Sequence, residues 1–316
     1  MLSRFLTGLG RTMVALGAIL GLFVAFQLWG TGYEESRAQD ALAPELVEGS
    51  SGGIDDVSES LRSIDPTDVS DLAVPSEGDS LGIIQLEPGR NEAGIDMRKV
   101  FIEGTDKDDL KQGPGHYMGT PFPGQSGNAA IAGHRVTYGS PFHRIDELVP
   151  GDLITVLTRQ GEFFYEVMAP PADFAGEKGP AHWIVDPSDT SVLEDFGDDR
   201  LTLTACHPKY SAKQRIIVAA KLVGAPANTT AGTDTAPAEL ADSEEPAQLD
   251  DLGWRSENFP KALAWSVAAV AVWLAAALLG KLIGPFRWIV YLAATPAFFY
   301  CLWFAFTWIN QWVPSL

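Results

Sequence analysis

The stretch LTLTACHPKYSAKQRIIV, residues 201–218, decides the fold of the central part of the chain. Apolar residues alternate with Thr202, Thr204 and Cys206, as the two-residue period of a β-strand requires. The HPKYSA segment that follows carries turn residues, and a second strand-like run begins at Arg215. If the intervening segment folds back, Arg215 lies beside Cys206. The sequence therefore predicts a hairpin that brings one thiol and one guanidinium together.

The central part of the chain contains five short strand-like runs, and the last two form this hairpin. The runs are AAIAGH (129–134), DLITVLT (152–158), FFYEVM (163–168), RLTLTAC (200–206) and RIIVAAKLV (215–223). Segments that contain Gly and Pro separate them, and few helical periods occur between them. Many short strands with turn signals predict a closed barrel or a sandwich, here one domain over 81–224.

Cys206 needs a base if it acts as a nucleophile, because the thiolate is the reactive form. The chain has five histidines, and the candidates besides His134 are His116, His143, His182 and His207. His134 ends an apolar run directly after a glycine, which suits a catalytic residue, although a surface histidine in a turn fits the same pattern. His207 is a rival, but neighbouring strand side chains point to opposite faces. Spacing alone leaves the choice open.

Three uncharged runs are long enough to cross a membrane as helices. The first extends from Thr12 to Tyr33, the second from Ala262 to Gly280, and the third begins at Trp288. The first could be a secretory signal peptide, but it exceeds the usual ~7 to 15 apolar residues and no A-x-A-like site follows it closely. We therefore predict an uncleaved N-terminal anchor and a C-terminal transmembrane hairpin.

Basic residues flank these runs on one predicted side of the membrane. Arg4 and Arg11 precede the first run, and Lys281 and Arg287 lie in the turn between the second and third. The positive-inside rule places the N-terminus and this turn in the cytoplasm. The chain is then a multi-pass protein of the cell membrane with its central domain outside the cell.

The net charge of −19 is concentrated in two segments. Residues 34–80 hold 13 acidic and 2 basic residues, and residues 225–260 hold 8 acidic and 1 basic. Segments this acidic, with few aromatic residues, are typical of disordered linkers, and nucleic acid is not an expected partner. The predicted organisation is an anchor (1–33), a linker (34–80), a catalytic domain (81–224), a second linker (225–260) and a transmembrane hairpin (261–316).

Three separated blocks, in the same order, strongly resemble sortases. They are EGTDKDDLKQGPGHYMGTPFPGQSGNAAIAGHR (103–135), GSPFHRIDELVPGD (139–152) and LTLTACHPKYSAKQRIIV (201–218), and the likeness is greatest to class E sortases of high-GC Gram-positive bacteria. The resemblance implies a mainly β fold with an eight-stranded β-barrel. With the apolar runs, the expected architecture adds one N-terminal and two C-terminal transmembrane helices.

The same resemblance implies a catalytic set of three residues. The family histidine matches His134, the cysteine nucleophile matches Cys206, and the arginine matches Arg215. Without the resemblance, Arg215 would be assigned to an exposed salt bridge. The chain departs from the family pattern at Ala205, where a threonine is usual, and this leaves the substrate preference open.

Two further groups of residues are candidates for binding. Tyr117 and Thr204 are expected to line the substrate groove, with structural packing as the alternative. Asp106, Asp108 and Asp109 cluster as in some metal sites, but they lack the glycine and terminal glutamate of an EF-hand loop. We predict neither a required metal nor any other cofactor.

Sortases similar to this chain cut an L-P-x-T-G-like or L-A-x-T-G-like sorting signal between Thr and Gly. The expected partners are secreted proteins with a C-terminal sorting signal and a peptidoglycan precursor that supplies an amine. Pilin polymerisation and a non-enzymatic membrane scaffold remain alternatives. An L,D-transpeptidase is disfavoured because its S-H-G-C-x-R block is absent around Cys206.

Overall fold

The structure is a computed structural model, and it describes residues 2–47, 50–64, 75–228 and 256–312. The chain divides into two units, Met1–Gln27 with Leu252–Ser315, and Leu28–Asp251. Most of the linker predicted over 225–260 lies outside the described residues.

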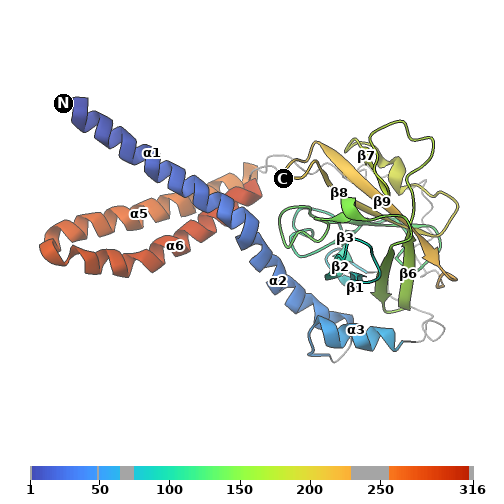
Figure 1. The fold of residues 1–316 in the computed structure, drawn as a ribbon. Coiled ribbons are helices and arrows are strands. Elements are labelled where there is room, and N and C mark those ends of the chain that lie inside the picture. Colours follow the sequence, from blue (N-terminus) through green and yellow to red (C-terminus); the bar gives the residue numbers. More distant parts are fainter. Residues whose placement is uncertain (1, 48–49, 65–74, 229–255, 313–316) are drawn as a thin grey trace. The chain divides into compact units, whose positions relative to one another are not determined.

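Eight strands of the second unit close into a β-barrel (Figure 1). Around the ring the order is β6, β5, β1, β2, β3, β4, β8 and β9, and β9 pairs back with β6. β7 joins β9 outside the ring. The strands are β1 (Ser80–Leu86), β2 (Met97–Glu103), β3 (Gly115–His116), β4 (Asn128–Ala132), β5 (Leu153–Thr158), β6 (Gly161–Val167), β7 (His182–Val185), β8 (Arg200–His207) and β9 (Gln214–Val223). The predicted eight-stranded barrel is confirmed.

Five strands, β4, β5, β6, β8 and β9, coincide with the predicted runs to within two residues. The other four were not predicted. β3 and β7 are too short to show a period. β2 carries Arg98 and Lys99, whose charges interrupt its apolar pattern and pair with the acidic side chains of Asp55 and Glu35.

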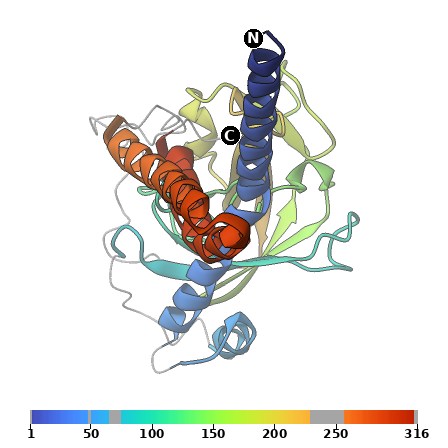
Figure 2. The same ribbon diagram turned by 90° about the vertical axis from the view of Figure 1, so that its left-hand side faces the viewer.

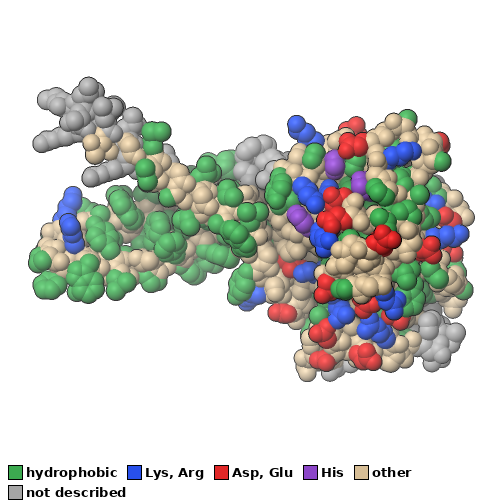
Figure 3. All heavy atoms as spheres, viewed as in Figure 1, with side chains coloured by type: hydrophobic (Ala, Val, Ile, Leu, Met, Phe, Trp, Pro, Cys, Tyr) green, Lys and Arg blue, Asp and Glu red, His purple; other side chains and the backbone are tan. Residues whose placement is uncertain are grey.

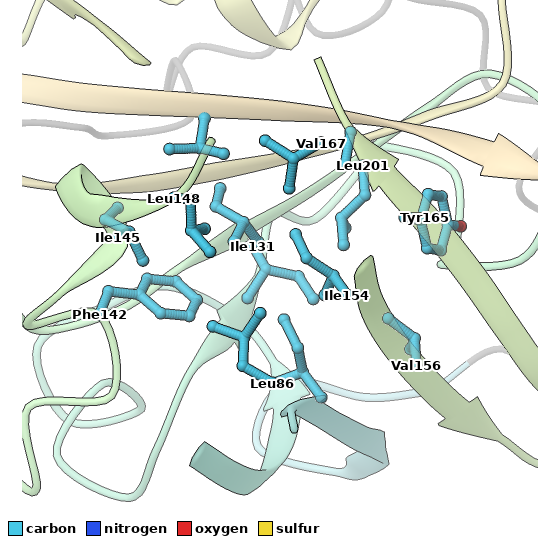
Figure 4. Packing of buried hydrophobic residues seen from close by; sticks show 14 of the residues in the cluster. Leu86, Ile131, Phe142, Ile145, Leu148, Ile154, Val156, Tyr165, Val167 and Leu201 are labelled. Atoms are coloured by element: carbon cyan, nitrogen blue, oxygen red, sulfur yellow. The ribbon is translucent and has the colours of Figure 1, made fainter. Parts of the chain in front are cut away.

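The interior of the barrel is filled by one apolar cluster (Figure 4). Ile131, Ile154 and Leu201 point toward one another there and are fully buried. In β8, the alternate residues Leu203 and Ala205 belong to the same cluster. The intervening residues of β8, which include Cys206, therefore lie on the outer face of the barrel.

Part of the predicted linker at 34–80 is helical instead. Residues 31–62 contain α2 (Thr31–Leu42), the 3₁₀ turn η2 (Ala43–Leu46) and α3 (Ile54–Arg62), while 65–74 lie outside the described residues. Leu42, Leu46, Val57 and Leu61 are buried against apolar residues of β1, β2 and β5. Acidic residues dominate the composition of this segment. A smaller number of apolar side chains, spaced so that they share a face of each helix, packs against the barrel.

The first unit consists of the terminal helices. α1 (Leu2–Ala25) continues as the π-helical turn η1 (Phe26–Gly30), and α5 (Phe259–Ile283) and α6 (Arg287–Trp312) lie side by side in Figures 1 and 2. Ala262, Ala269 and Ala276 are buried at seven-residue spacing on α5. Such small residues allow close approach between helices in a membrane.

By length and composition, the segments Met13–Leu46 and Phe259–Asn310 are apolar enough to cross a membrane. Hydrophobic side chains cover α5 and α6, whereas acidic and basic side chains are spread over the barrel unit (Figure 3). The hairpin reverses at Gly284, whose φ is +63°. The helices at both ends of the chain therefore have the properties that the sequence predicted.

Candidate active site

Cys206 and Arg215 are directly opposite each other on neighbouring strands. β8 and β9 pair antiparallel, and their register matches Cys206 with Arg215. Residues paired in this way bring their Cβ atoms to about 4.5–5.5 Å of each other. Cys206 is a free, partly buried cysteine, and Arg215 is 6% exposed. The predicted hairpin and its pairing are confirmed.

His134 follows the end of β4, which is the other neighbour of β8. The two strands are parallel, with Ala132 opposite Thr204, and the Gly133 N–H donates to the Thr204 carbonyl at 3.0 Å. The pairing ends there, and His134 and Cys206 each come two residues later in the chain. A Cβ atom at position 133 would overlap the Phe142 ring, so glycine is needed for this close packing.

The side chain of His134 is almost completely buried. It is 6% exposed, and its ring packs against Tyr138 with centroids 5.1 Å apart. Among the described residues, its Nε2 atom has no hydrogen-bond partner. A buried nitrogen without a partner costs stability, which natural proteins accept mainly at sites where a ligand or substrate binds.

Burial lowers the pKa of His134 to about 4, and the positive charges of Lys107 and Lys111 add to this effect. The imidazole is therefore neutral at physiological pH and able to accept a proton.

Burial also raises the pKa of the Cys206 thiol, whereas the cations of Arg215 and Arg135 lower it. Burial has the larger effect, so the resting thiol is protonated. Hydrogen bonds from Arg215 Nη1 to the carbonyls of Ala212 and Gln214, both 3.0 Å, hold its guanidinium in place. The thiol and this fixed cation thus face each other at one end of β8, and the neutral imidazole follows the end of the neighbouring strand β4.

Comparison with known proteins identifies the family. The family model described as "Sortase domain" matches residues 93–223. Sortase D of Bacillus subtilis is 30% identical over 217 residues, which cover 67% of this chain and 96% of that protein. The chain belongs to the sortase family. Sortases are cysteine transpeptidases that act on secreted proteins with sorting signals, so the chain is an enzyme of that type.

Other sortases are also similar. Sortase SrtE1 of Streptomyces coelicolor is 29% identical over 229 residues, covering 68% of this chain and 56% of that protein. The solved structure of a Clostridium perfringens Sortase D5 transpeptidase is 27% identical, with a TM-score of 0.41, and the match covers 61% of this chain and 99% of that one.

Arg135 is a second arginine of this sortase that lies beside Cys206. Its side chain is 2% exposed, and Nη1 lies 3.4 Å from the Cys206 carbonyl oxygen. Nη2 forms an ion pair with Asp146 at 2.9 Å. Arg135 thus places a second cation beside the thiol. The only signal in the sequence was its position directly after His134.

Tyr117 and Thr204 lie on the same outer face as Cys206 but contact each other. The Tyr117 hydroxyl and Thr204 Oγ1 are 2.8 Å apart, and the two residues are 2% and 1% exposed. Burial raises the pKa of Tyr117 to about 12, so the phenol stays neutral. The two side chains therefore pack against each other, and a contact of either one with substrate stays a prediction.

The four other histidines of the sortase have different surroundings. His116 is fully buried, with Nδ1 at 2.9 Å from Glu103 and Nε2 at 3.0 Å from the Pro121 carbonyl. His143 Nδ1 contacts the Arg135 carbonyl at 2.7 Å. His182 and His207 are only partly buried. Of the five, His134 combines near-complete burial with an Nε2 atom that has no partner among the described residues.

Three carboxylates that could hold a metal ion come together, two of them in the loop between β2 and β3. Oxygen atoms of Glu77, Asp106 and Asp109 lie within 4.8 Å of one another. Asp106 Oδ1 also accepts the backbone N–H groups of Asp108 and Asp109, at 2.7 and 2.9 Å. These bonds stabilise a turn of the chain, and independence from metal stays a prediction.

Proposed function

We propose that this sortase cleaves an L-A-x-T-G or L-P-x-T-G-like sorting signal between Thr and Gly, with Cys206 as the nucleophile. The observation that carries the proposal is the pairing of Cys206 with Arg215 across β8 and β9, with His134 two residues beyond the end of β4, the other neighbour of β8. The set supplies a nucleophile, a cation for an oxyanion and a proton carrier, as acyl transfer requires.

In the first half of the reaction, the Cys206 sulfur attacks the threonine carbonyl carbon, and the thiol proton passes to His134. The carbonyl oxygen becomes an oxyanion, which the Arg215 guanidinium stabilises. The Thr–Gly C–N bond then breaks, and His134 returns the proton to the departing glycine amine. The products are a thioester on Cys206 and a free C-terminal peptide.

In the second half, an amine of a peptidoglycan precursor attacks the thioester. His134 takes a proton from this amine, a new amide bond forms, and the C–S bond breaks. The Cys206 sulfur leaves and is protonated again. The secreted protein is then attached to the cell wall through its threonine, and no cofactor enters the balance.

Mass spectrometry tests the proposal. The full chain in detergent micelles is incubated with L-A-x-T-G and L-P-x-T-G peptides, with and without an amine acceptor. We expect a thioester adduct on Cys206 that the acceptor converts to an amide product, and neither in Cys206→Ala. An adduct at another residue, or cleavage by Cys206→Ala, would contradict the proposed chemistry.

The pH dependence of cleavage follows from the two shifted pKa values. Because the pKa of His134 is lowered and that of Cys206 is raised, the imidazole stays neutral and the thiol stays protonated over a wide pH range. We expect kcat/KM to be constant near neutral pH and to fall as the pH drops through about 4, where His134 gains a proton. A control assay at pH 7 after each incubation excludes denaturation. An acid limb near the ordinary histidine value of 6.5 would contradict the burial of His134.

Labelling of introduced cysteines tests the proposed topology. In a variant without native cysteines, a membrane-impermeant maleimide on whole cells should modify cysteines at Ser60 and Thr233 and spare one at Gly284. Ser60 lies in α3 and Gly284 in the turn of the hairpin, while Thr233 is outside the described residues. Labelling at Gly284 would overturn the proposed orientation, which rests on the flanking basic residues.

A further inference from the structure

Helix α2 docks on the barrel with a row of buried polar side chains. Thr31, Glu35 and Gln39 are 0%, 1% and 7% exposed, and their four-residue spacing puts them on one face. Burying polar groups is unfavourable unless they find partners, and apolar residues such as Leu42 would suffice for docking alone. The partners of the three side chains therefore indicate what α2 is for.

Two of these side chains reach the loop that follows His134. Thr31 Oγ1 accepts the Tyr138 N–H at 3.1 Å, and the Tyr138 ring packs on the His134 ring. The Glu35 carboxylate forms an ion pair with Lys99 of β2 at 2.6 Å, and it also lies against Gly139, where a Cβ atom would overlap it. With a φ of +71°, position 139 favours glycine for its backbone as well.

The third side chain reaches the loop between β2 and β3. Gln39 Nε2 donates to the Gln112 carbonyl at 2.8 Å and to the Val100 carbonyl at 2.9 Å, and Oε1 accepts the Val100 N–H at 2.7 Å. A Cβ atom at Gly113 would overlap the Gln39 amide. The same loop carries Lys107 and Lys111, whose charges act on His134.

We propose that Thr31, Glu35 and Gln39 of α2 are positioning residues of this sortase, which fix the two loops that flank His134. The inference rests on the proposed function, in which His134 carries the proton. α2 begins directly after η1, at the end of the apolar N-terminal run. The chain that anchors the enzyme thus also sets the geometry of its acid/base residue.

The test compares variants of the full chain in detergent micelles. In Thr31→Val, which keeps the shape but removes the acceptor for Tyr138, we expect kcat to fall about 5-fold or more with KM within about 2-fold. Thr31→Ser restores the acceptor and is expected to restore kcat. Ser36→Ala removes an exposed hydroxyl from the same helix and serves as the control.

Hydrogen exchange locates the effect. Peptides that cover 133–144 should exchange faster in Thr31→Val than in the wild-type chain or in Ser36→Ala. Gln39→Met keeps the length of the side chain and removes all three of its hydrogen bonds, so we expect faster exchange over 104–114 and a lower kcat. Thermal unfolding verifies that each variant is folded.

The outcomes separate this inference from the proposed function. A wild-type kcat in Thr31→Val, or an equal loss in Thr31→Ser, would overturn the positioning role. If the wild-type chain forms no adduct with any sorting peptide, the proposed function fails. The positioning role is then tested by the rate at which iodoacetamide alkylates Cys206. Slower alkylation in Thr31→Val than in Ser36→Ala then supports the positioning role, and equal rates overturn it.

Discussion

Replacing His134 by alanine is expected to reduce kcat for peptide cleavage by about 10²- to 10⁴-fold, the usual contribution of a general acid/base. The neutral imidazole is buried beside the end of β8 with its Nε2 atom unpaired among the described residues, so it is ready to accept the thiol proton. His134→Gln can still form hydrogen bonds but cannot carry a proton at neutral pH, and it should be equally impaired. Steady-state kinetics with a fluorogenic sorting peptide measure both.

The matched control is His207→Ala, because His207 follows the nucleophile in the chain and lies 3.4 Å from Arg135. We expect it to keep most of its activity. His116→Ala is unsuitable as a control, because it would leave Glu103 buried without its partner and destabilise the barrel. An equal loss of kcat in His207→Ala and His134→Ala would show either that His207 is the base or that both histidines act indirectly.

Arg215→Lys is expected to fold normally and to lose about 10²-fold or more in kcat/KM, comparable to the loss of one oxyanion donor. The planar fork of donors on Arg215 binds the backbone carbonyls of Ala212 and Gln214 opposite Cys206, whereas lysine offers a flexible point charge. The lysine variant cannot reproduce both sets of contacts. Circular dichroism and thermal unfolding verify the fold, and peptide kinetics measure the loss.

Arg200→Lys is the matched control for this substitution. Arg200 begins the strand that ends near Cys206, pairs with Asp198 and stacks over Phe196, so the exchange alters a surface contact at the far end of β8. We expect near wild-type activity. Normal activity of Arg215→Lys would show that charge alone suffices at this position, and normal activity of Arg215→Ala would remove Arg215 from the mechanism.

Much of the barrel could be predicted because its strands carry their pattern locally. The alternation in LTLTAC identified β8 and the face of Cys206, and the turn residues after it gave the hairpin partner Arg215. The apolar helices at both ends follow from length and composition in the same way. The strands β3 and β7 were not predicted because they are short, and β2 was not predicted because it carries charges whose partners lie elsewhere in the chain.

The sequence by itself determined the family, the barrel and the cysteine with its facing arginine, since these depend on neighbours in the chain and on ordered motifs. Spacing alone left the choice among the five histidines open, and the resemblance selected His134. Only the tertiary structure shows its surroundings, because the parallel pairing of β4 with β8 joins segments about seventy residues apart. It also brought Arg135 to Cys206 and α2 to the loops beside His134. The composition of residues 34–80 predicted a linker, because its many acidic residues obscure the few side chains of α2 that are buried. The partners of those side chains include backbone groups that are distant in the sequence.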